Sequence, residues 1–125
     1  ATSISQVAAT AAMNESYYWL DEFRAHLTKN RDYAVDFINQ LLYLKAYKPQ
    51  GTYLLYVDIS ELHMTGEEFT EYLKKEEKLA IIPGGLKFFG EESEGHVRIC
   101  IATSMEILKE GLNRLKEGVE RLTGK

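Results

Sequence analysis

The residue of this chain best suited to chemistry is Arg98, which lies in a segment, 95–104, where apolar and polar residues alternate. Alternation with a period of two is typical of a β-strand, because successive side chains point to opposite faces. One face carries β-branched residues that we expect to pack on the core: Val97, Ile99 and Ile101. The other face places Arg98 among small or polar neighbours: His96, Cys100 and Ala102.

Two interpretations of Arg98 stay open on spacing alone. A charged residue in the middle of a strand is usually a solvated cation on the outer face of a sheet. A guanidinium is also a planar, permanently charged fork that binds a carboxylate or a phosphate through two parallel hydrogen bonds. The second interpretation predicts a binding site for a small anion at Arg98.

Three other polar residues near this strand are weaker candidates. Cys100 shares a face with Arg98, whose charge would lower the pKa of the thiol, but a buried and inert thiol is the commoner situation. His96 is either a residue at the rim of a binding site or an exposed residue at the start of a strand. Asp58 ends an earlier apolar segment, where it either faces the same site or caps a turn.

The composition is that of one ordinary globular domain. The chain has 125 residues, of which 45% are hydrophobic and 27% are charged, and this is enough for a single core. The formal net charge of -4 and the lack of a basic stripe exclude nucleic acid as a default partner. The single cysteine, Cys100, excludes an internal disulfide and points to the reducing cytoplasm.

The sequence also gives no sign of a metal site, a membrane segment or a targeting signal. The three histidines, His26, His63 and His96, are too far apart to show ligand spacing. The apolar runs are too short to span a bilayer, and the start has no basic region followed by a hydrophobic stretch. We therefore predict a cytoplasmic protein that contacts neither a metal nor a membrane.

Hydrophobic periodicity predicts the elements that position Arg98. A short helix and a long helix come first, followed by a strand, a helix, two strands and a final helix. We therefore predict an α+β, two-layer domain, with a mainly antiparallel sheet of three strands, helices on one face and a long N-terminal helix. The predicted helices before the first strand cover 5–13 and 17–44, the strands cover 52–59, 79–82 and 95–104, and the middle helix covers 64–78.

Capping residues and glycines mark the ends of the later helices. Thr65 with Glu68, and Thr103 with Glu106, have the spacing of a capping box, which predicts a helix start at each place. Gly111 and Gly118 lie on nearly the same side of the last helix, where they permit close backbone contact. Gly124 follows that helix and is expected to end it.

A glycine-rich segment between the last two strands is a candidate binding loop. It contains Pro83, Gly84, Gly85, Phe89 and Gly90. The segment is a poor phosphate cradle, because no helix start follows it to supply backbone N–H donors. A mobile loop at the border of a binding site fits the same composition.

Several short motifs stand in a fixed order along the chain: Gln50-Gly-Thr-Tyr53, Val57-Asp58, Pro83-Gly84, Phe89-Gly90, Glu94-Gly-His-Val-Arg98 and Ala102-Thr-Ser104. Together they resemble the carboxy-terminal small domain of fold-type-I, class I/II aminotransferases, the aspartate-aminotransferase-like enzymes that use pyridoxal 5′-phosphate. A single pair such as Pro-Gly is a weak signal. The ordered set at fitting intervals covers essentially the whole chain and is a strong one.

The resemblance implies a role for Arg98 and for the glycine-rich loop. Arg98 would bind the α-carboxylate of an amino-acid or keto-acid substrate, and the loop 83–90 would border the site. The loop departs from the usual pattern of the family, Pro-Gly-Ser-x-Phe-Gly. Four residues, Gly85-Leu-Lys-Phe88, lie between Pro83-Gly84 and Phe89-Gly90, where the family commonly has two.

The resemblance also implies what this chain lacks. The Schiff-base lysine and the groups that hold the cofactor belong to a large domain upstream, and Lys87 does not occupy the position of the family's lysine. We expect residues 1–15 to be a helical segment left from the large domain or the interdomain region, and residues 16–125 to be the small domain. The full-length parent would bind pyridoxal phosphate and form a homodimer. The isolated chain would bind no cofactor, hold no catalytic residue and be inactive.

Two alternatives stay open. A related branch of the same fold performs carbon–sulfur β-elimination on cystathionine-like substrates, and the Gly-Thr-Tyr-Leu-Leu stretch is compatible with that branch. The other alternative is a free-standing, non-enzymatic module that binds a small carboxylate or a protein partner.

Overall fold

Four α-helices and four strands form the part of the chain that the computed structural model describes, residues 2–124. Ala1 and Lys125, which are the outer limits of the two expected domains, lie outside the described residues. The elements are α1 (Ser3–Glu15), α2 (Tyr17–Ile38), β1 (Lys45–Ala46), β2 (Leu54–Asp58), α3 (Gly66–Glu76), β3 (Ile82–Pro83), β4 (His96–Cys100) and α4 (Met105–Thr123).

The strands form one antiparallel sheet in the order β1-β2-β4-β3. The prediction of an α+β domain with an antiparallel sheet is confirmed, but the predicted number of three strands is wrong. The additional strand is β1, which has only two residues and pairs with β2. A strand this short has no periodicity of its own, so only its pairing partner defines it.

The long helix ends earlier than predicted, and Asn39 is the reason. The helix α2 ends at Ile38, not near residue 44, and Asn39 caps it. The Asn39 amide then bonds both backbone groups of Ala46: its Oδ1 accepts from the Ala46 N–H at 2.8 Å, and its Nδ2 donates to the Ala46 carbonyl at 3.2 Å. One side chain thus ends the helix and holds β1 beside it.

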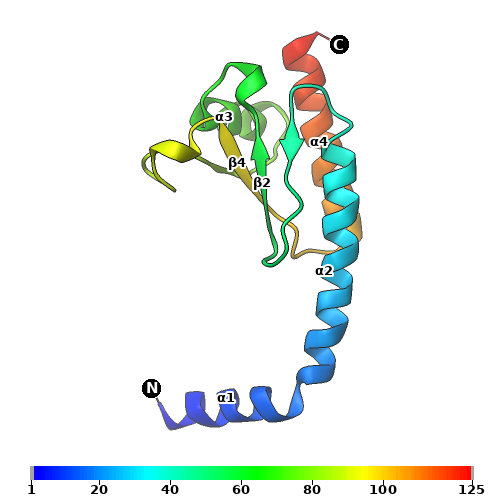
Figure 1. Ribbon diagram of the computed structural model, residues 1–125, viewed down its shortest axis with the longest axis vertical. Coiled ribbons are helices and arrows are strands. Elements are labelled where there is room, and N and C mark those ends of the chain that lie inside the picture. Colours follow the sequence, from blue (N-terminus) through cyan, green and yellow to red (C-terminus); the bar gives the residue numbers. More distant parts are fainter. Residues whose placement is uncertain (1, 125) are drawn as a thin grey trace.

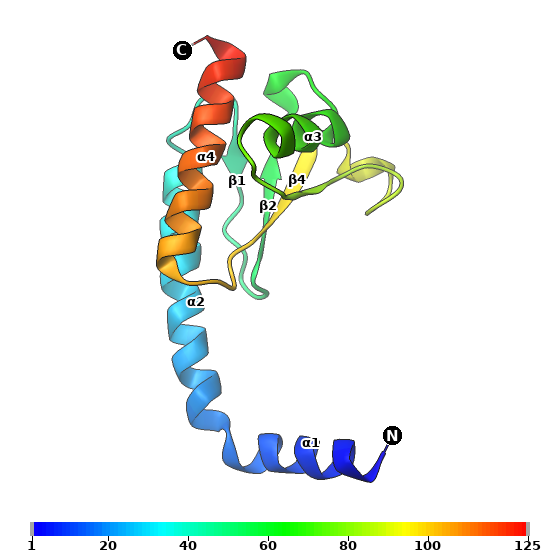
Figure 2. The same ribbon diagram turned by 180° about the vertical axis from the view of Figure 1, so that it is seen from behind.

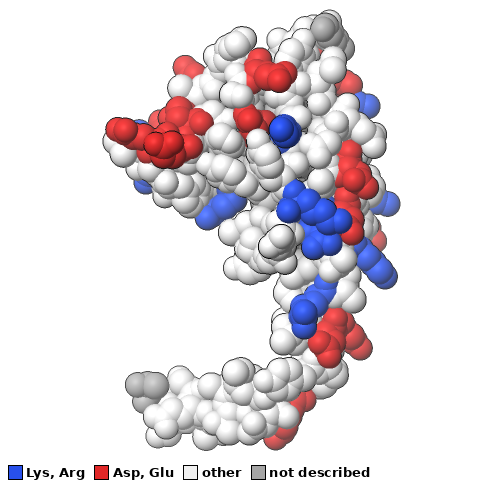
Figure 3. All heavy atoms as spheres, viewed as in Figure 1, with Lys and Arg blue, Asp and Glu red and all other residues white. Residues whose placement is uncertain are grey.

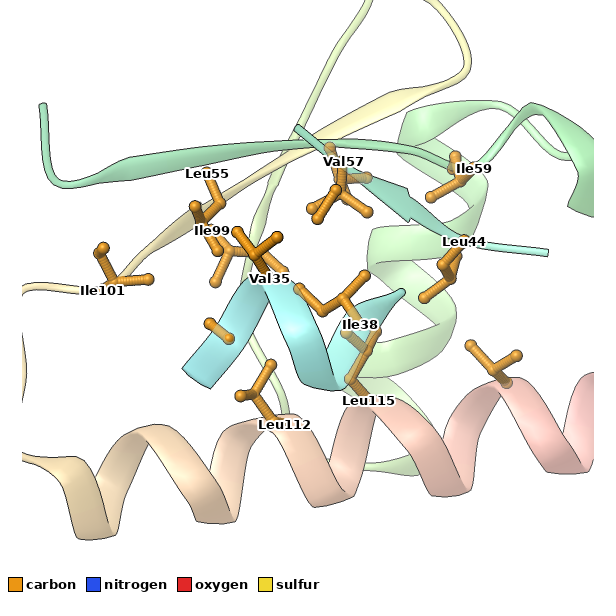
Figure 4. Close-up of a cluster of buried hydrophobic side chains, with 14 of the residues drawn as sticks. Val35, Ile38, Leu44, Leu55, Val57, Ile59, Ile99, Ile101, Leu112 and Leu115 are labelled. Carbon is orange, nitrogen blue, oxygen red and sulfur yellow. The ribbon is translucent and has the colours of Figure 1, made fainter. Parts of the chain in front are cut away.

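The helices α2, α3 and α4 cover one face of the sheet, and the opposite face is left open (Figures 1 and 2). The apolar core lies between the two layers, where β2 and β4 face α2 and α4 (Figure 4). Its fully buried side chains are Ala34, Ile38, Leu55, Val57, Ile59, Phe69, Leu73 and Ile101. Burial of such side chains contributes about 1.5–3 kcal/mol each, and it fixes the sheet against the helices.

The helix starts are set by hydroxyl caps. The Thr65–Glu68 capping box is confirmed, with reciprocal bonds at the start of α3. The predicted box at Thr103 is wrong, because Ser104 is the residue that caps α4, accepting from the Ile107 N–H. The Thr103 carbonyl accepts hydrogen bonds from α2 instead, so the backbone joins the helix one residue later. Gly124, in the left-handed region, ends α4 as predicted.

The strand predicted over 79–82 also differs. The strand β3 consists of Ile82 and Pro83, so the proline lies inside it. Proline is tolerated there because β3 is an edge strand. Residues 79–81 instead run toward α4, where Leu79 lies opposite Gly111.

The first helix meets α2 at a sharp bend at Ser16 and lies crosswise at the far end of α2, apart from the sheet (Figure 1). No residue of α1 is buried. Exposed apolar side chains continue from α1 into the start of α2: Ile4, Val7, Met13, Tyr17, Tyr18 and Trp19. Within residues 2–124, no helix has both the length and the apolar character needed to cross a bilayer.

Candidate functional site

The open face of the sheet carries alternate residues of three strands. Pairing in register places Tyr56 of β2 and Ile82 of β3 on either side of Arg98 in β4. Paired residues in an antiparallel ladder project to the same face, so these three side chains lie together. They are half-buried or exposed, whereas the intervening residues of β2 and β4 are buried, which confirms the predicted faces of the Arg98 strand.

Arg98 is the arginine that lacks a carboxylate partner in this chain. All five arginines lie within the described residues, and the other four each form an ion pair with an acidic side chain at 2.8–3.8 Å. The pairs are Arg24–Asp21, Arg31–Asp32, Arg114–Glu110 and Arg121–Glu77. The charge of Arg98 is therefore not neutralised by its own chain.

The guanidinium of Arg98 is stacked on an aromatic ring. Its central carbon lies 4.3 Å from the centroid of the Phe89 ring. The Arg98 Nε is buried and has no hydrogen-bond partner within residues 2–124. A buried donor without an acceptor costs about 1–3 kcal/mol, so hydrogen bonding within the described residues does not account for the position of this group.

The loop that carries Phe89 is fastened at both ends. The Gly84 N–H donates to the His96 carbonyl at 2.8 Å, which extends the β3–β4 pairing. Gly85 and Gly90 form an antiparallel bridge across the loop, and both adopt positive φ angles, 108° and 93°. Glycine adopts these angles at no steric cost.

Ser93 closes this loop, and sequence analysis missed it. Its hydroxyl accepts from the Gly85 N–H at 2.7 Å and donates to the Gly90 carbonyl at 2.6 Å. A Cβ on Gly84 would lie 1.9 Å from the Ser93 carbonyl oxygen, so only glycine fits there. The one sequence signal was a small polar residue inside an acidic run.

His96 and Asp58 serve the local structure around Arg98. The His96 ring stacks on Tyr56, with centroids 4.6 Å apart, and its Nδ1 donates to the Glu94 carbonyl. The Asp58 carboxylate accepts from the Ser60 N–H at 2.9 Å. Hydrogen bonds from the hydroxyl and the backbone of Ser60 hold the pKa of Asp58 below its ordinary value. The interpretation of Asp58 as a turn cap is confirmed.

Cys100 and a neighbouring groove lie along the same strand. The thiol of Cys100 is exposed, so the expectation of a buried thiol is wrong. A largely apolar groove of about 390 Å³ runs beside Arg98 and Cys100, between β3 and the first half of α4, with Ile82 and Ile107 in its walls. Apolar surroundings strengthen an ionic contact, because water screens the charges less.

A buried asparagine in α2 holds the exit of the Arg98 strand. Asn30 is fully buried, and its Nδ2 donates to the carbonyls of Ile101 and Thr103 at 2.9 and 2.8 Å. The Nε2 of His26, one turn earlier, donates to the same Thr103 carbonyl at 2.7 Å. These contacts fix the connection from β4 to α4. The sequence signal for Asn30 was a polar residue on an otherwise apolar helix face.

Within residues 2–124, no group of three or more histidine, cysteine or acidic side chains is arranged to hold a metal ion. The open face is therefore defined by an unpaired guanidinium, an aromatic ring beneath it and an apolar groove at its side. Such a site is suited to a small organic anion.

Comparison with known proteins places this fold in a class. No protein-family profile matches the chain. The chain is 34% identical over 130 residues to a probable aspartate/prephenate aminotransferase of Rickettsia typhi, which covers 96% of this chain and 32% of that protein. A putative aminotransferase from Clostridium difficile 630, solved with bound pyridoxal phosphate, is 36% identical, with a TM-score of 0.85 over 94% of this chain and 30% of that one.

A third similarity is to a protein described as a C-S lyase. The C-S lyase of Staphylococcus hominis, solved with bound pyridoxal phosphate, superposes with a TM-score of 0.85 at 29% identity, over 95% of this chain and 32% of that one. The fold is thus shared by a wider class of pyridoxal-phosphate proteins. Within that class, this chain belongs to the fold-type-I aminotransferase family and spans about 30% of the length of its relatives.

Lys87 does not have the surroundings of a Schiff-base lysine. Lys87, the lysine on the loop beside Arg98, is 74% exposed, and its ammonium lies 2.9 Å from the Glu67 carboxylate. A Schiff-base lysine lies in a desolvated site, whereas the Lys87 ammonium is exposed and already forms an ion pair.

Proposed function

We propose that this chain is the C-terminal small domain of a pyridoxal-phosphate-dependent amino-acid aminotransferase, in which Arg98 binds the substrate α-carboxylate. The observation that carries the proposal is the unpaired guanidinium of Arg98, on a face that the chain's own helices leave open. In this proposal, residues 1–15 link to a large domain, and residues 16–125 form the small domain. The parent would be a cytoplasmic homodimer that acts on amino acids and keto acids.

Arg98 would act by orienting the substrate. A guanidinium fork matches a carboxylate through two parallel hydrogen bonds, which fixes the direction of the carboxylate as well as its place. Since Arg98 lies in a strand paired on both sides, the backbone beneath it is held by β2 and β3. This positioning places the α-carbon for proton removal by groups outside this chain. The electron sink would be the cofactor of the large domain.

The exposed apolar surface supports a missing large domain and argues against a free-standing module. The arm α1 has a single charged residue, Glu15, and Figure 3 shows its visible face as almost uncharged. Such surface on an isolated domain marks a site of contact with another protein surface. A self-contained carboxylate-binding module would need no such arm. We therefore propose that the isolated chain binds no cofactor and is catalytically inactive.

The test uses the full-length protein that contains this chain. Arg98→Ala should lower kcat/KM for transamination by about 30- to 1,000-fold, because a desolvated charge pair with the substrate is lost. The kcat/KM of Arg98→Lys should lie between that of the unsubstituted protein and that of Arg98→Ala, since lysine keeps the charge but not the fork. Arg114→Ala is the matched control, because Arg114 already pairs with Glu110. If Arg98→Ala and Arg114→Ala have equal kcat/KM, the role of Arg98 is refuted.

Carbon–sulfur lyase activity is the second candidate, favoured by the structural similarity to the C-S lyase of Staphylococcus hominis. Product analysis of the full-length protein separates the two reactions. A transaminase converts an amino acid and a keto acid into the exchanged pair. A lyase acting on a cystathionine-like substrate releases pyruvate, ammonia and a thiol, and that result would replace the aminotransferase proposal.

A further inference from the structure

The contact between Phe89 and Arg98 joins a loop to a strand nine residues further along the chain. The Phe89 ring is 43% exposed, so it is not a core residue. Its one ring contact with a charged group is the guanidinium of Arg98, among the residues that the structure describes. The ring is thus only partly buried, and it lies against the guanidinium of Arg98.

We propose that Phe89 is a positioning residue that holds the guanidinium of Arg98 in the orientation that receives a carboxylate. This inference rests on the proposed function of Arg98. An acidic partner would fix a guanidinium equally well, but it would neutralise the charge and compete with the ligand. An aromatic face contacts only the flat side of the guanidinium and leaves its in-plane N–H donors free.

The hydrogen bonding of Arg98 supports this role. No side chain or carbonyl within residues 2–124 accepts a hydrogen bond from the buried Nε. The stacked ring is therefore a contact that we expect to restrict rotation of the guanidinium. Losing the ring would return rotational freedom to a long side chain, and this freedom would have to be lost again on binding.

The loop fixes Phe89 independently of Arg98. The Phe89 N–H donates to the Gly85 carbonyl at 3.0 Å, inside the loop that Ser93 and the Gly85–Gly90 bridge close. Phe88 donates to the same carbonyl at the same distance and is 46% exposed, but it makes no ring contact with Arg98. Phe88 is therefore a matched control in residue type, loop and exposure.

The experiment is NMR spectroscopy of the isotope-labelled full-length protein that contains this chain, titrated with succinate as the carboxylate probe. The ring current of Phe89 should displace the Arg98 Nε–Hε signal, and Phe89→Leu should abolish that displacement. Phe89→Leu should also weaken succinate binding by about three- to tenfold, the cost of immobilising one more long side chain. Phe88→Leu should change neither quantity, and Phe89→Tyr should retain both.

The outcomes distinguish this inference from the function on which it rests. If succinate binds to the unsubstituted protein and Arg98→Ala abolishes binding, but Phe89→Leu binds as tightly, the positioning role is overturned and the carboxylate role stands. If succinate leaves the Arg98 signals of the unsubstituted protein unmoved, the carboxylate role is overturned, and the positioning role with it. Because Phe89 is exposed, its replacement by leucine leaves no cavity in the core.

Discussion

At the scale of single residues, the neighbours of each arginine decide whether its charge is neutralised within the chain or left available to a ligand. The fully paired arginines hold helices and loops together, as Arg121 does with the buried Glu77. Arg98 has an aromatic ring in place of a carboxylate. A permanent charge that is held in place but not neutralised costs the fold some stability, and this is the usual condition of a binding residue.

The most strongly perturbed carboxyl of the chain gives a prediction about acid stability. Hydrogen bonds from Arg31 at 2.8 Å and Lys48 at 2.9 Å lower the pKa of Asp32 from 3.8 to about 2. Since the folded-state pKa lies below the unfolded one, the stabilisation is present above pH 3.8 and is lost as the pH falls toward 2. Asp32→Asn should remove that part of the pH dependence, as measured by urea unfolding across this window.

The control for Asp32 is Asp21→Asn, because the Asp21–Arg24 pair is longer, 3.8 Å, and lies on an exposed helix face. This variant should keep the pH dependence of the unsubstituted chain. Equal slopes of unfolding free energy against pH in Asp32→Asn and in the unsubstituted chain would contradict the prediction.

At the scale of elements, the packing of α4 on α3 depends on one glycine. A Cβ on Gly118 would lie 2.6 Å from the Leu73 Cδ2 and 3.1 Å from the Glu77 Cγ, and both of these residues are buried. Gly118→Ala should therefore lower the free energy of unfolding by about 1–3 kcal/mol, because the core must shift to admit a methyl group. Urea denaturation followed by circular dichroism measures this change.

Gly111 in the same helix offers the opposite case. A Cβ there would meet only the Leu79 Cδ1, at an ordinary contact distance of 3.7 Å. Gly111→Ala should be neutral or stabilising by up to about 1 kcal/mol, because alanine is the better helix former. Two changes of the same sign and size would show that helix propensity, not packing, governs both positions.

At the scale of the whole molecule, the chain divides into a packed head and a projecting arm (Figure 1). Because no residue of α1 is buried, removal of residues 1–15 should change the free energy of unfolding by less than about 0.5 kcal/mol. The same removal should reduce binding of a hydrophobic dye, since exposed apolar side chains go with it. Thermal unfolding and dye fluorescence measure the two effects.

A truncation at the other end is the control for the arm. Removing residues 105–124 deletes α4 and its buried side chains Leu108, Leu112 and Leu115, so that chain should not fold. A loss of folding on removal of residues 1–15 would mean that α1 contributes to the head, contrary to the prediction.

The sequence alone determined the parts of this protein that depend on local pattern. The faces of the Arg98 strand, the Thr65 capping box and the glycine end of α4 follow from residue type and spacing over a few positions. The ordered motifs identified the family for the same reason, because they are read along the chain. Arg98 was the leading candidate because no other arginine lay in the middle of an alternating strand.

The tertiary structure alone decided the parts that depend on residues distant in sequence. The strand β1 exists because Asn39 and β2 supply its partners, and α4 starts at Met105 because α2 holds the Thr103 carbonyl. The stacking of Phe89 on Arg98 brings together a strand and a loop that Ser93 closes. Long-range contacts leave no periodicity in the sequence, since their free energy arises only once separate elements pack together.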